Sequence, residues 1–582
     1  MSASPQPPYR CHWPFIALLL VWAGVARAGI EVEVKGLEGA EKENVELRLR
    51  IRASAKSEEL DDLLVEGLHE RATDDIRSAL QPYGYYSPKI ESSLTGQAPN
   101  WKASYTIDKG PPTLITRIDV EVEGEGQKDR IFRRIFRRFP LTTYERLQHS
   151  EYEAAKTQLA QAAYAEGYLD AAFTRSQLRV NPEERSAEIE LILSTGPRYY
   201  FGPVTVEQTR LDPGVAERYV TLEPGAPFDP QKLVDTQFAL TDLDYFQSVE
   251  IEPQRSKVEG QRIPMVIHTT PRPKRKWDFG VGYGTDTGAR TSIANDVRYL
   301  NTKGHKLHAE VQLSQIKNNA SGEYRIPLGH KPGEYWGFGG AVQTERYEDG
   351  DSLKYVLNTS LNRFPGHWKR KWYLSYEHEE SELSDLVQTA DLLMPGIEFN
   401  RSELNNQILT RRGWALFVDA HGAQKGLLAN ATFLQTHAIV RGVWPFSRDW
   451  RVLGRVEYGA NIVDEFSQLP ASQRFFAGGD QSVRGYSYQS IGPKDADGKV
   501  IGGQYLAGFS LETDYYFWDK WGAAVFYDAG GADDNIVPKL FQGIGIGARY
   551  RSPVGYIQAD IAHPLDGDES GVRLHVGIRV GL

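Results

Sequence analysis

Short alternating segments make up the chain from Trp277 to its end, and they constrain the fold more than any other feature of the sequence. Each segment runs for about ten residues and is followed by a cluster of Gly, Asn, Asp or Pro, which is typical of strands joined by turns. The first and last segments carry apolar side chains on one face, at Trp277, Phe279, Val281 and Tyr283, and at Leu574, Val576, Ile578, Val580 and Leu582. The opposite faces include the glycines Gly280, Gly282, Gly284 and Gly577. One face suits lipid and the other suits an aqueous lumen.

A strand of this length can cross a membrane. Because lipid does not tolerate an unpaired strand edge, strands of this kind must close into a barrel. At roughly 19 residues for each strand and its connection, the region provides about sixteen strands. We therefore expect a 16-stranded transmembrane antiparallel β-barrel over residues 274–582. A soluble β-sandwich is the alternative.

The N-terminus predicts export. Arg10 and His12 precede an apolar run that is followed by the small-residue site Ala26-Arg27-Ala28, so residues 1–28 are a predicted signal peptide. An N-terminal membrane anchor is the alternative, although the run is shorter than the roughly 20 residues that span a bilayer. The single cysteine, Cys11, lies in this segment. The mature chain would therefore have no disulfide and no thiolate metal site.

Three α+β repeats are predicted between the signal peptide and the barrel. Each opens with a short strand, continues through charged helical sequence, reaches an aromatic turn and closes with another strand. The turns begin at Gly84, Gly167 and Asp244, which is a domain-sized period of roughly 80 residues. The predicted domains are residues 29–110, 111–197 and 198–273. In the second, an apolar helical stripe is expected at Tyr152, Ala155, Leu159 and Ala162. Three unrelated fragments are the alternative.

The overall charge and the absence of familiar motifs exclude several functions. The net charge of -10 argues against a nucleic-acid partner, which would require a basic surface. The sequence contains no Gly-x-Ser-x-Gly elbow and no His-Glu-x-x-His pair. We therefore expect a protein that is not an enzyme and that uses neither a metal nor another cofactor.

The tract from residue 474 to 486 is the strongest candidate for a functional site. It contains Gly478, Gly479, Asp480, Val483, Arg484, Gly485 and Tyr486. Glycines permit close backbone approach, and an arginine that folds into a confined space needs a carboxylate or aromatic partner. Alternation in residues 521–530 places Phe526 and Asp528 on one face of a strand. If that face is the lumen, Asp528 can pair with Arg484 while Phe526 stacks against it.

These segments resemble the lid-loop motif and the Phe-x-Asp-x-Gly strand of the BamA-like superfamily, whose barrels carry periplasmic POTRA domains. The second motif falls here on Phe526, Asp528 and Gly530. The resemblance covers essentially the whole mature chain. Within the superfamily, the three repeats and residues 282–288, 324–328 and 552–555 are most similar to the TamA family.

The resemblance implies how the barrel works. Arg484 would hold an inward-folded sixth extracellular loop against Asp528 and Phe526 on the barrel wall. A weakly paired seam, the lateral gate, would lie between the first strand, about residues 277–284, and the last, about residues 573–582. The gate residues would be Gly280, Gly282, Gly284, Gly577, Val580 and Leu582. Glycine-rich strands hold a neighbour poorly, and an open edge can accept an incoming strand. Packing room at a curved closure explains these glycines equally well.

The resemblance also implies a function. The protein would assist the assembly of autotransporters and other outer-membrane proteins, in contact with outer-membrane lipid. Its partner would be a TamB-like periplasmic protein anchored in the inner membrane. A two-partner-secretion transporter is the first alternative, although such proteins usually carry two repeats and a plug helix. A passive channel is the second alternative, and it leaves the three repeats and the Arg484 tract unexplained.

Overall fold

The computed structural model describes residues 29–55, 60–284, 288–329, 331–384, 386–566 and 571–581. The predicted signal peptide and Leu582 lie outside these ranges, as does the middle of the 282–288 tract. The chain forms two compact units, one made of residues up to 200 with 227–230, the other of residues 201–226 with 231–582. Among the described residues, no helix is long and apolar enough to cross a membrane.

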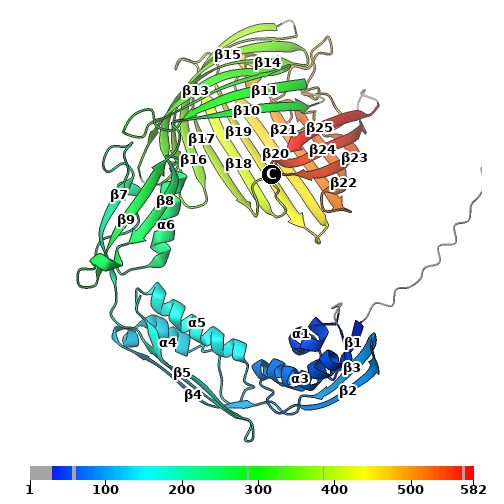
Figure 1. Cartoon of the computed structure of the whole chain (residues 1–582). Coiled ribbons are helices and arrows are strands. Elements are labelled where there is room, and N and C mark those ends of the chain that lie inside the picture. The colour runs from blue at the N-terminus through cyan, green and yellow to red at the C-terminus, as the bar shows by residue number, and fades with distance from the viewer. Residues whose placement is uncertain are drawn as a thin grey trace, which may run out of the picture. The chain divides into compact units, whose positions relative to one another are not determined.

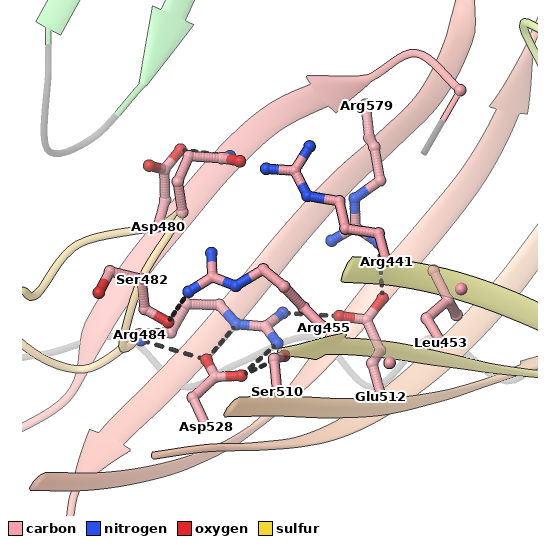
Figure 2. Close-up of a pocket in the computed structure, with 14 residues that line it drawn as sticks. Arg441, Leu453, Arg455, Asp480, Ser482, Arg484, Ser510, Glu512, Asp528 and Arg579 are labelled. Atoms are coloured by element: carbon pink, nitrogen blue, oxygen red, sulfur yellow. Dashed lines mark hydrogen bonds and ion pairs between the residues drawn. The ribbon is translucent and has the colours of Figure 1, made fainter. Parts of the chain in front are cut away.

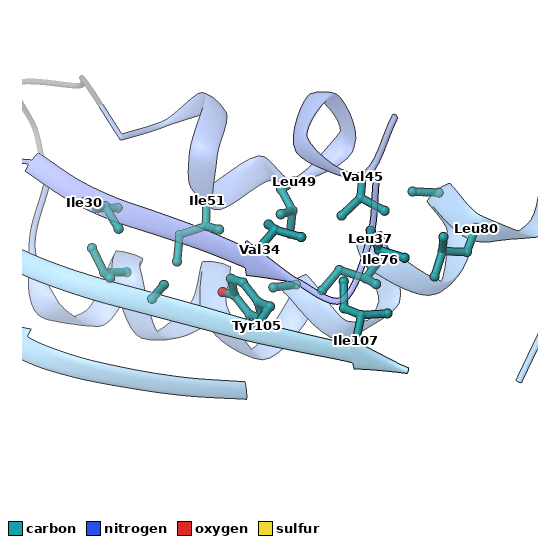
Figure 3. Packing of buried hydrophobic residues seen from close by; sticks show 14 of the residues in the cluster. Ile30, Val34, Leu37, Val45, Leu49, Ile51, Ile76, Leu80, Tyr105 and Ile107 are labelled. Carbon is teal, nitrogen blue, oxygen red and sulfur yellow. The ribbon is translucent and has the colours of Figure 1, made fainter. Parts of the chain in front are cut away.

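The first repeat folds as helices packed on a three-stranded sheet with the order β1-β3-β2. Its elements are β1 (Gly29–Lys35), α1 (Gly39–Arg48), α2 (Arg50–Ala53), α3 (Asp62–Leu80), β2 (Lys89–Gln97) and β3 (Asn100–Asp108). Asp61 caps α3 by accepting a hydrogen bond from the Leu64 amide at 2.7 Å. Every second residue of β3 is buried, so Tyr105 and Ile107 meet apolar side chains from the helices (Figure 3). This shared core makes the repeat a domain.

The second and third repeats have the same architecture, with sheet orders β4-β6-β5 and β7-β9-β8. The second contains β4 (Leu114–Glu123), α4 (Arg130–Phe136), α5 (His149–Ala165), β5 (Ala172–Asn181) and β6 (Ser186–Ser194). The third contains β7 (Tyr200–Glu207), α6 (Pro230–Asp242), β8 (Phe246–Pro253) and β9 (Arg262–Pro271). The stripe on α5 differs from the prediction at one position. Ala163 is fully buried and Ala162 only partly so, because the fourth contact falls four residues after Leu159 rather than three.

The three aromatic turns share one backbone conformation. Gly84, Gly167 and Asp244 all have positive φ angles, of 85°, 89° and 59°. A helix commonly ends in this left-handed conformation, which glycine adopts at no steric cost and aspartate tolerates better than most residues. The repeated spacing of the turns therefore reflects a repeated structural requirement. The third turn uses an aspartate, whose side chain has a separate role described below.

The remaining strands form one 16-stranded antiparallel sheet that curls into a barrel (Figure 1). In order they are β10 (Arg275–Gly284), β11 (Gly288–Val297), β12 (Lys306–Ser314), β13 (Lys317–Pro327), β14 (Tyr335–Tyr347), β15 (Gly350–Arg363), β16 (Lys369–Leu383), β17 (Leu386–Leu404), β18 (Gly413–Ala423), β19 (Phe433–Pro445), β20 (Trp450–Val463), β21 (Tyr505–Tyr516), β22 (Trp521–Asp533), β23 (Phe541–Ser552), β24 (Gly555–Pro564) and β25 (Arg573–Arg579). Three POTRA-like domains followed by a 16-stranded barrel confirm the predicted fold class.

The two faces of the barrel strands differ as alternation predicts. Phe279 and Val281 on β10 are 76% and 89% exposed, and Leu574 and Ile578 on β25 are also exposed. His575, between them on the other face, is buried. A large apolar surface of this kind is stable only in contact with lipid.

The first and last strands lie at the two ends of the sheet. Each strand from β11 to β24 pairs with both neighbours, whereas β10 pairs with β11 and β25 pairs with β24. Within the described ranges, no ladder of backbone hydrogen bonds joins β10 to β25. The seam between them is therefore the weakest line in the wall of the barrel.

The third POTRA-like domain is tied to the barrel by the side chains of its turn. Asp244 accepts a hydrogen bond from Arg298 at 2.9 Å and forms an ion pair with Arg272 at 3.1 Å. The Tyr245 hydroxyl donates to the Gly304 carbonyl at 2.5 Å. Burial raises the pKa of this hydroxyl well above its ordinary value. These contacts make the domain and the base of the barrel one packed unit.

Replacing Asp244 separates its two contributions. Asp244→Asn keeps a residue that tolerates the left-handed backbone but removes the charge, whereas Asp244→Ala loses both. We expect the alanine variant to be less stable than the asparagine variant by about 1 kcal/mol. Thermal unfolding of the purified protein in detergent measures the difference. Asp242→Asn, on the exposed face of α6, is the control and should leave the unfolding temperature unchanged.

Candidate lid-loop site in the barrel lumen

The connection between β20 and β21 folds into the barrel. Its cross-links include short β-bridges between Phe475 and Gly503 and between Ala477 and Ile491. Buried apolar side chains on the loop and the wall form one cluster, made of Phe475, Ala477, Val483, Tyr486, Ile491, Leu506 and Ala532. Burial of these apolar side chains therefore holds one side of the loop against the barrel wall. The other side of the loop is polar and carries Arg484.

Arg484 lies at the centre of a buried ionic cluster (Figure 2). Its guanidinium donates to both carboxylate oxygens of Asp528, from Nε at 2.7 Å and from Nη2 at 3.0 Å. Nη1 donates to Glu512 at 2.7 Å and to Asp560 at 3.0 Å. The Arg484 side chain is 4% exposed. A bidentate pair with two further carboxylates satisfies the guanidinium although its side chain is buried.

Phe526 completes the environment of this arginine. The Arg484 Cζ atom lies 3.4 Å from the centre of the Phe526 ring. Phe526 and Asp528 are both buried on the lumen face of β22. The structure therefore contains the ion pair and the stacking contact expected from alternation. Ser510 on β21 donates to Asp528 at 2.6 Å and fixes the carboxylate.

Further charges extend the cluster around the wall. Arg549 on β23 contacts Glu512 at 3.0 Å and Asp514 at 3.4 Å, and it also pairs with Asp560. Arg451 on β20 donates to Asp514 at 2.8 Å. The cluster thus joins strands β20 to β24 to the loop. Removing one partner from a buried cluster leaves an uncompensated charge, which costs about 3–5 kcal/mol.

The last strand takes part in the same cluster. Arg579 on β25 lies 3.2 Å from Glu512, which also binds Arg484. The Gly485 amide donates to His575 Nε2 at 3.3 Å. A cavity of about 110 Å³ lies among these groups and is lined by residues of the loop, the wall and β25. The loop is thus linked to the strand that borders the seam.

Glycines on both sides permit the close approach of loop and wall. Gly478, Gly479 and Gly485 have φ angles of 103°, 98° and 104°, which side-chain-bearing residues rarely adopt. A Cβ atom on Gly530 would lie 3.0 Å from Val483. A Cβ on Gly543 would lie 2.2 Å from the Arg484 carbonyl oxygen. The glycines of β22 and β23 therefore provide the space in which the loop sits.

Other residues of the candidate tract anchor its ends. The Tyr486 hydroxyl donates to the Asp566 carbonyl at 2.6 Å and packs edge-on against Phe541. Val483 is fully buried. Asp480 lines the cavity beside Arg484. The tract therefore acts as one docked segment.

The predicted gate residues lie on the two end strands. Gly280, Gly282 and Gly284 belong to β10 and Gly577 to β25. A Cβ on Gly577 would meet no atom within 4 Å, whereas one on Gly280 would meet the Ser292 hydroxyl at 2.5 Å. Val580 is 59% exposed, and Leu582 lies outside the described residues. The glycine at 577 borders open space, so a close contact with the wall does not account for it.

The sequence predicts only Arg484 and Asp528 of the ionic cluster. It does not predict the other six charged residues, which are Arg451, Glu512, Asp514, Arg549, Asp560 and Arg579. A signal for Glu512 was present, because alternation places Ser510, Glu512 and Asp514 on one face of β21. Three polar residues on one face of a spanning strand indicate a lumen surface. The convergence of Glu512, Asp528 and Asp560 on Arg484 depends on the curvature of the barrel, which the sequence does not reveal.

Comparison with known proteins agrees with this architecture. Residues 300–581 match the family model of the Omp85 superfamily domain, and residues 31–109 match that of POTRA domain TamA domain 1. The outer membrane protein assembly factor BamA of Nitratidesulfovibrio vulgaris is 22% identical over 88% of this chain and 67% of its own length. That of Neorickettsia risticii is 22% identical over 61% of this chain and 51% of its own. The chain thus spans between half and two thirds of these relatives.

A solved structure has the same fold. The crystal structure of BamA from Haemophilus ducreyi lacking POTRA domains 1–3 aligns with a TM-score of 0.67 and 16% identity, over 80% of this chain and 99% of that one. The chain carries an Omp85 superfamily domain behind POTRA-type domains. Its barrel and POTRA-type domains are those of an outer-membrane protein whose N-terminal domains lie in the periplasm, and the relatives named above are outer membrane protein assembly factors.

Arg484→Lys tests the ionic cluster. Lysine keeps the charge but cannot form the planar bidentate pair, so at least two charge-assisted hydrogen bonds are lost, each worth about 1.5–3 kcal/mol. We expect the barrel to unfold in SDS at a clearly lower temperature, which a heat-shift gel measures. Arg346→Lys is the control, because its ion pair with Asp351 is exposed and contributes about 0–1 kcal/mol. Equal shifts in both variants would contradict a structural role for the cluster.

Gly543→Ala tests the fit of the loop against the wall without changing any charge. The new methyl group would collide with the Arg484 backbone, so the loop must move away from β23. We expect faster protease cleavage within residues 474–503 while the barrel remains folded. Gly322→Ala is the control, since its nearest contact, at 3.8 Å, is an ordinary one. Unchanged cleavage would mean that the loop does not require this close approach.

Proposed function

We propose that this protein is the outer-membrane subunit of a translocation and assembly module, of the TamA type. It assists the insertion of client outer-membrane proteins, including autotransporters, through a lateral gate between β10 and β25. The observation that carries the proposal is the end of the sheet at these two strands, with no ladder between them in the described ranges. The match of residues 31–109 to a TamA-type POTRA domain supports this type.

The gate follows from the physics of strand pairing. A strand edge presents unpaired amides and carbonyls, which are costly in lipid and are satisfied when another strand pairs with them. Arg275 to Gly284 form such an edge on β10. A client strand that adds there satisfies the edge by β-augmentation. Its own folding supplies the free energy, so the process needs no nucleotide.

Arg484, with Asp528, Phe526 and the glycines of the tract, acts as a positioning residue in this proposal. The lid loop contacts β25 directly at His575, and Glu512 on β21 links the two indirectly because it pairs with both Arg484 and Arg579. Docking of the loop therefore braces the last strand from inside the lumen. Because β25 is held in place, β10 is the strand whose free edge can pair with an incoming client strand.

The periplasmic region contributes the second part of the proposed function. We propose POTRA domains over residues 29–110, 111–197 and 198–273, with the barrel following from residue 274. The first would bind a TamB-like partner anchored in the inner membrane, which delivers clients to the gate. A pull-down of such a partner that survives deletion of residues 29–110 would place the binding elsewhere.

A crosslink across the seam tests the gate. We would introduce Gly280→Cys and Gly577→Cys and follow assembly of an autotransporter in cells under oxidising and reducing conditions. The Ser292 hydroxyl that faces Gly280 can rotate, and Gly577 borders open space, so both positions accept a cysteine. We expect the disulfide to block client assembly and reduction to restore it.

The matched control is a crosslink between two paired strands. Val525 and Ile546 are partners on β22 and β23, and both face lipid. A Val525→Cys, Ile546→Cys disulfide should leave assembly unchanged, since that seam does not open. If the disulfide across β10 and β25 forms and clients still assemble, the gate is structural only and a channel or scaffold role becomes the better explanation.

A further inference from the structure

A basic cavity lies inside the barrel at the start of β10. Its volume is about 280 Å³, and the third POTRA-like domain and strands β10 to β13 contribute its walls. Five cations line it, and they are Arg272, Lys276, Arg298, Lys306 and Arg325. The only carboxylates in its described lining are Asp244 and Asp296. The cavity therefore has an excess of positive charge.

The carboxylates around this cavity are already paired. Asp244 binds Arg272 and Arg298, and Asp296 pairs with His308 at 2.7 Å. At the edge of the cavity, Asp278 pairs with Lys276 at 2.6 Å. Glu323 likewise pairs with Arg325 at 2.5 Å. Each of these four carboxylates thus has a close partner other than Lys306.

Lys306 is the cation without an acidic partner. Its ammonium donates to the Leu243 carbonyl at 2.7 Å and lies 4.7 Å from the centre of the Tyr245 ring. No carboxylate of the described residues lies within 4 Å of it. An ammonium group can form three hydrogen bonds, and one in a confined site favours an anion nearby. The cavity is therefore suited to a single carboxylate or phosphate group.

The position of the cavity decides which anion reaches it. The chain enters the barrel from the third POTRA-like domain, so Arg275 marks the periplasmic end of β10. A strand that pairs with β10 in the antiparallel sense runs toward that end and finishes there. Such a strand therefore presents its C-terminal carboxylate beside Lys276.

The distance to Lys306 is within reach of a chain end. β12 lies two strand spacings from β10 and therefore three, roughly 14 Å, from a strand that has added to the free edge of β10. Four residues of extended chain span about 13 Å, so a short segment beyond the paired residues can bring its carboxylate to the cavity. A segment that leaves a strand can turn away from the wall in this way. Beyond β25, the Gly581 amide donates to the Ile408 carbonyl, in the connection between β17 and β18.

We infer that this cavity binds the C-terminal carboxylate of a client strand that has added to β10. The inference rests on the proposed lateral gate. It explains how the gate would recognise the C-terminal strand of a client barrel. A free carboxylate at the correct distance from the paired segment fixes the register of the incoming strand. Capture of a chain terminus by a basic site is a known mode of peptide recognition.

The test uses the full-length protein in detergent and a peptide with the sequence of Arg573 to Leu582, labelled at its N-terminus. The peptide is prepared with a free C-terminal carboxylate and, separately, with a C-terminal amide. We expect fluorescence anisotropy to show about tenfold tighter binding of the acid. In Lys306→Gln and in Lys276→Gln that preference should fall toward one, while binding of the amide stays unchanged.

Lys303→Gln is the matched control, because it removes the same charge from an exposed position on the neighbouring turn and should keep the preference. Equal binding of acid and amide to the unaltered protein, or binding of neither, would overturn the inference. So would a Lys306-dependent affinity for phosphatidylglycerol vesicles in place of the peptide, which would make the cavity a lipid headgroup site. If acid and amide bind equally and the Gly280–Gly577 disulfide abolishes both, strand addition stands and only the carboxylate site fails.

Discussion

The buried contact between Arg484 and Asp528 organises the side of the barrel formed by β20 to β25. A buried arginine is tolerated only when its donors are matched, and here three carboxylates and an aromatic ring match them. Those carboxylates come from β21, β22 and β24, so the same contact that docks the loop also fixes the relative positions of these strands. The loop contacts β25 at His575, and Glu512 on β21 pairs with both Arg484 and Arg579. One ionic cluster thereby connects the interior of the barrel with its seam.

The rest of the barrel follows from the need to satisfy the backbone in lipid. Fifteen strand pairs are formed within one sheet of sixteen strands, and the sixteenth pair, between β10 and β25, is the one that would close it. Because this one strand pair is not formed, the least stable edge of the barrel lies at a defined place, between β10 and β25. The base of that edge is rigid, since Asp244 and Tyr245 attach the third POTRA-like domain there.

Periodicity in the sequence was sufficient to predict the fold. Alternation over residues such as Trp277 to Tyr283 predicted spanning strands and their lipid face, and the three aromatic turns predicted the repeats because each requires a left-handed residue. The predicted contact of Arg484 with Phe526 and Asp528 also followed from alternation on one strand. Glu512, Asp560 and Arg549 were not predicted, because no periodicity relates positions on different strands. Lys306 was not predicted for the same reason, because its distance from carboxylates depends on how the strands and the third POTRA-like domain pack together.

Hydrogen exchange of the protein in lipid nanodiscs, read by mass spectrometry, measures most directly whether β10 keeps an exchangeable edge. Peptides from Arg275 to Gly284 would be compared with those from Tyr335 to Tyr347 on β14, which pairs with both neighbours. We expect rapid exchange in β10, slow exchange in β14, and protection of β10 when a client strand is added. Slow exchange in β10 that equals that of β14, with or without a client, would show a closed barrel and contradict the lateral gate.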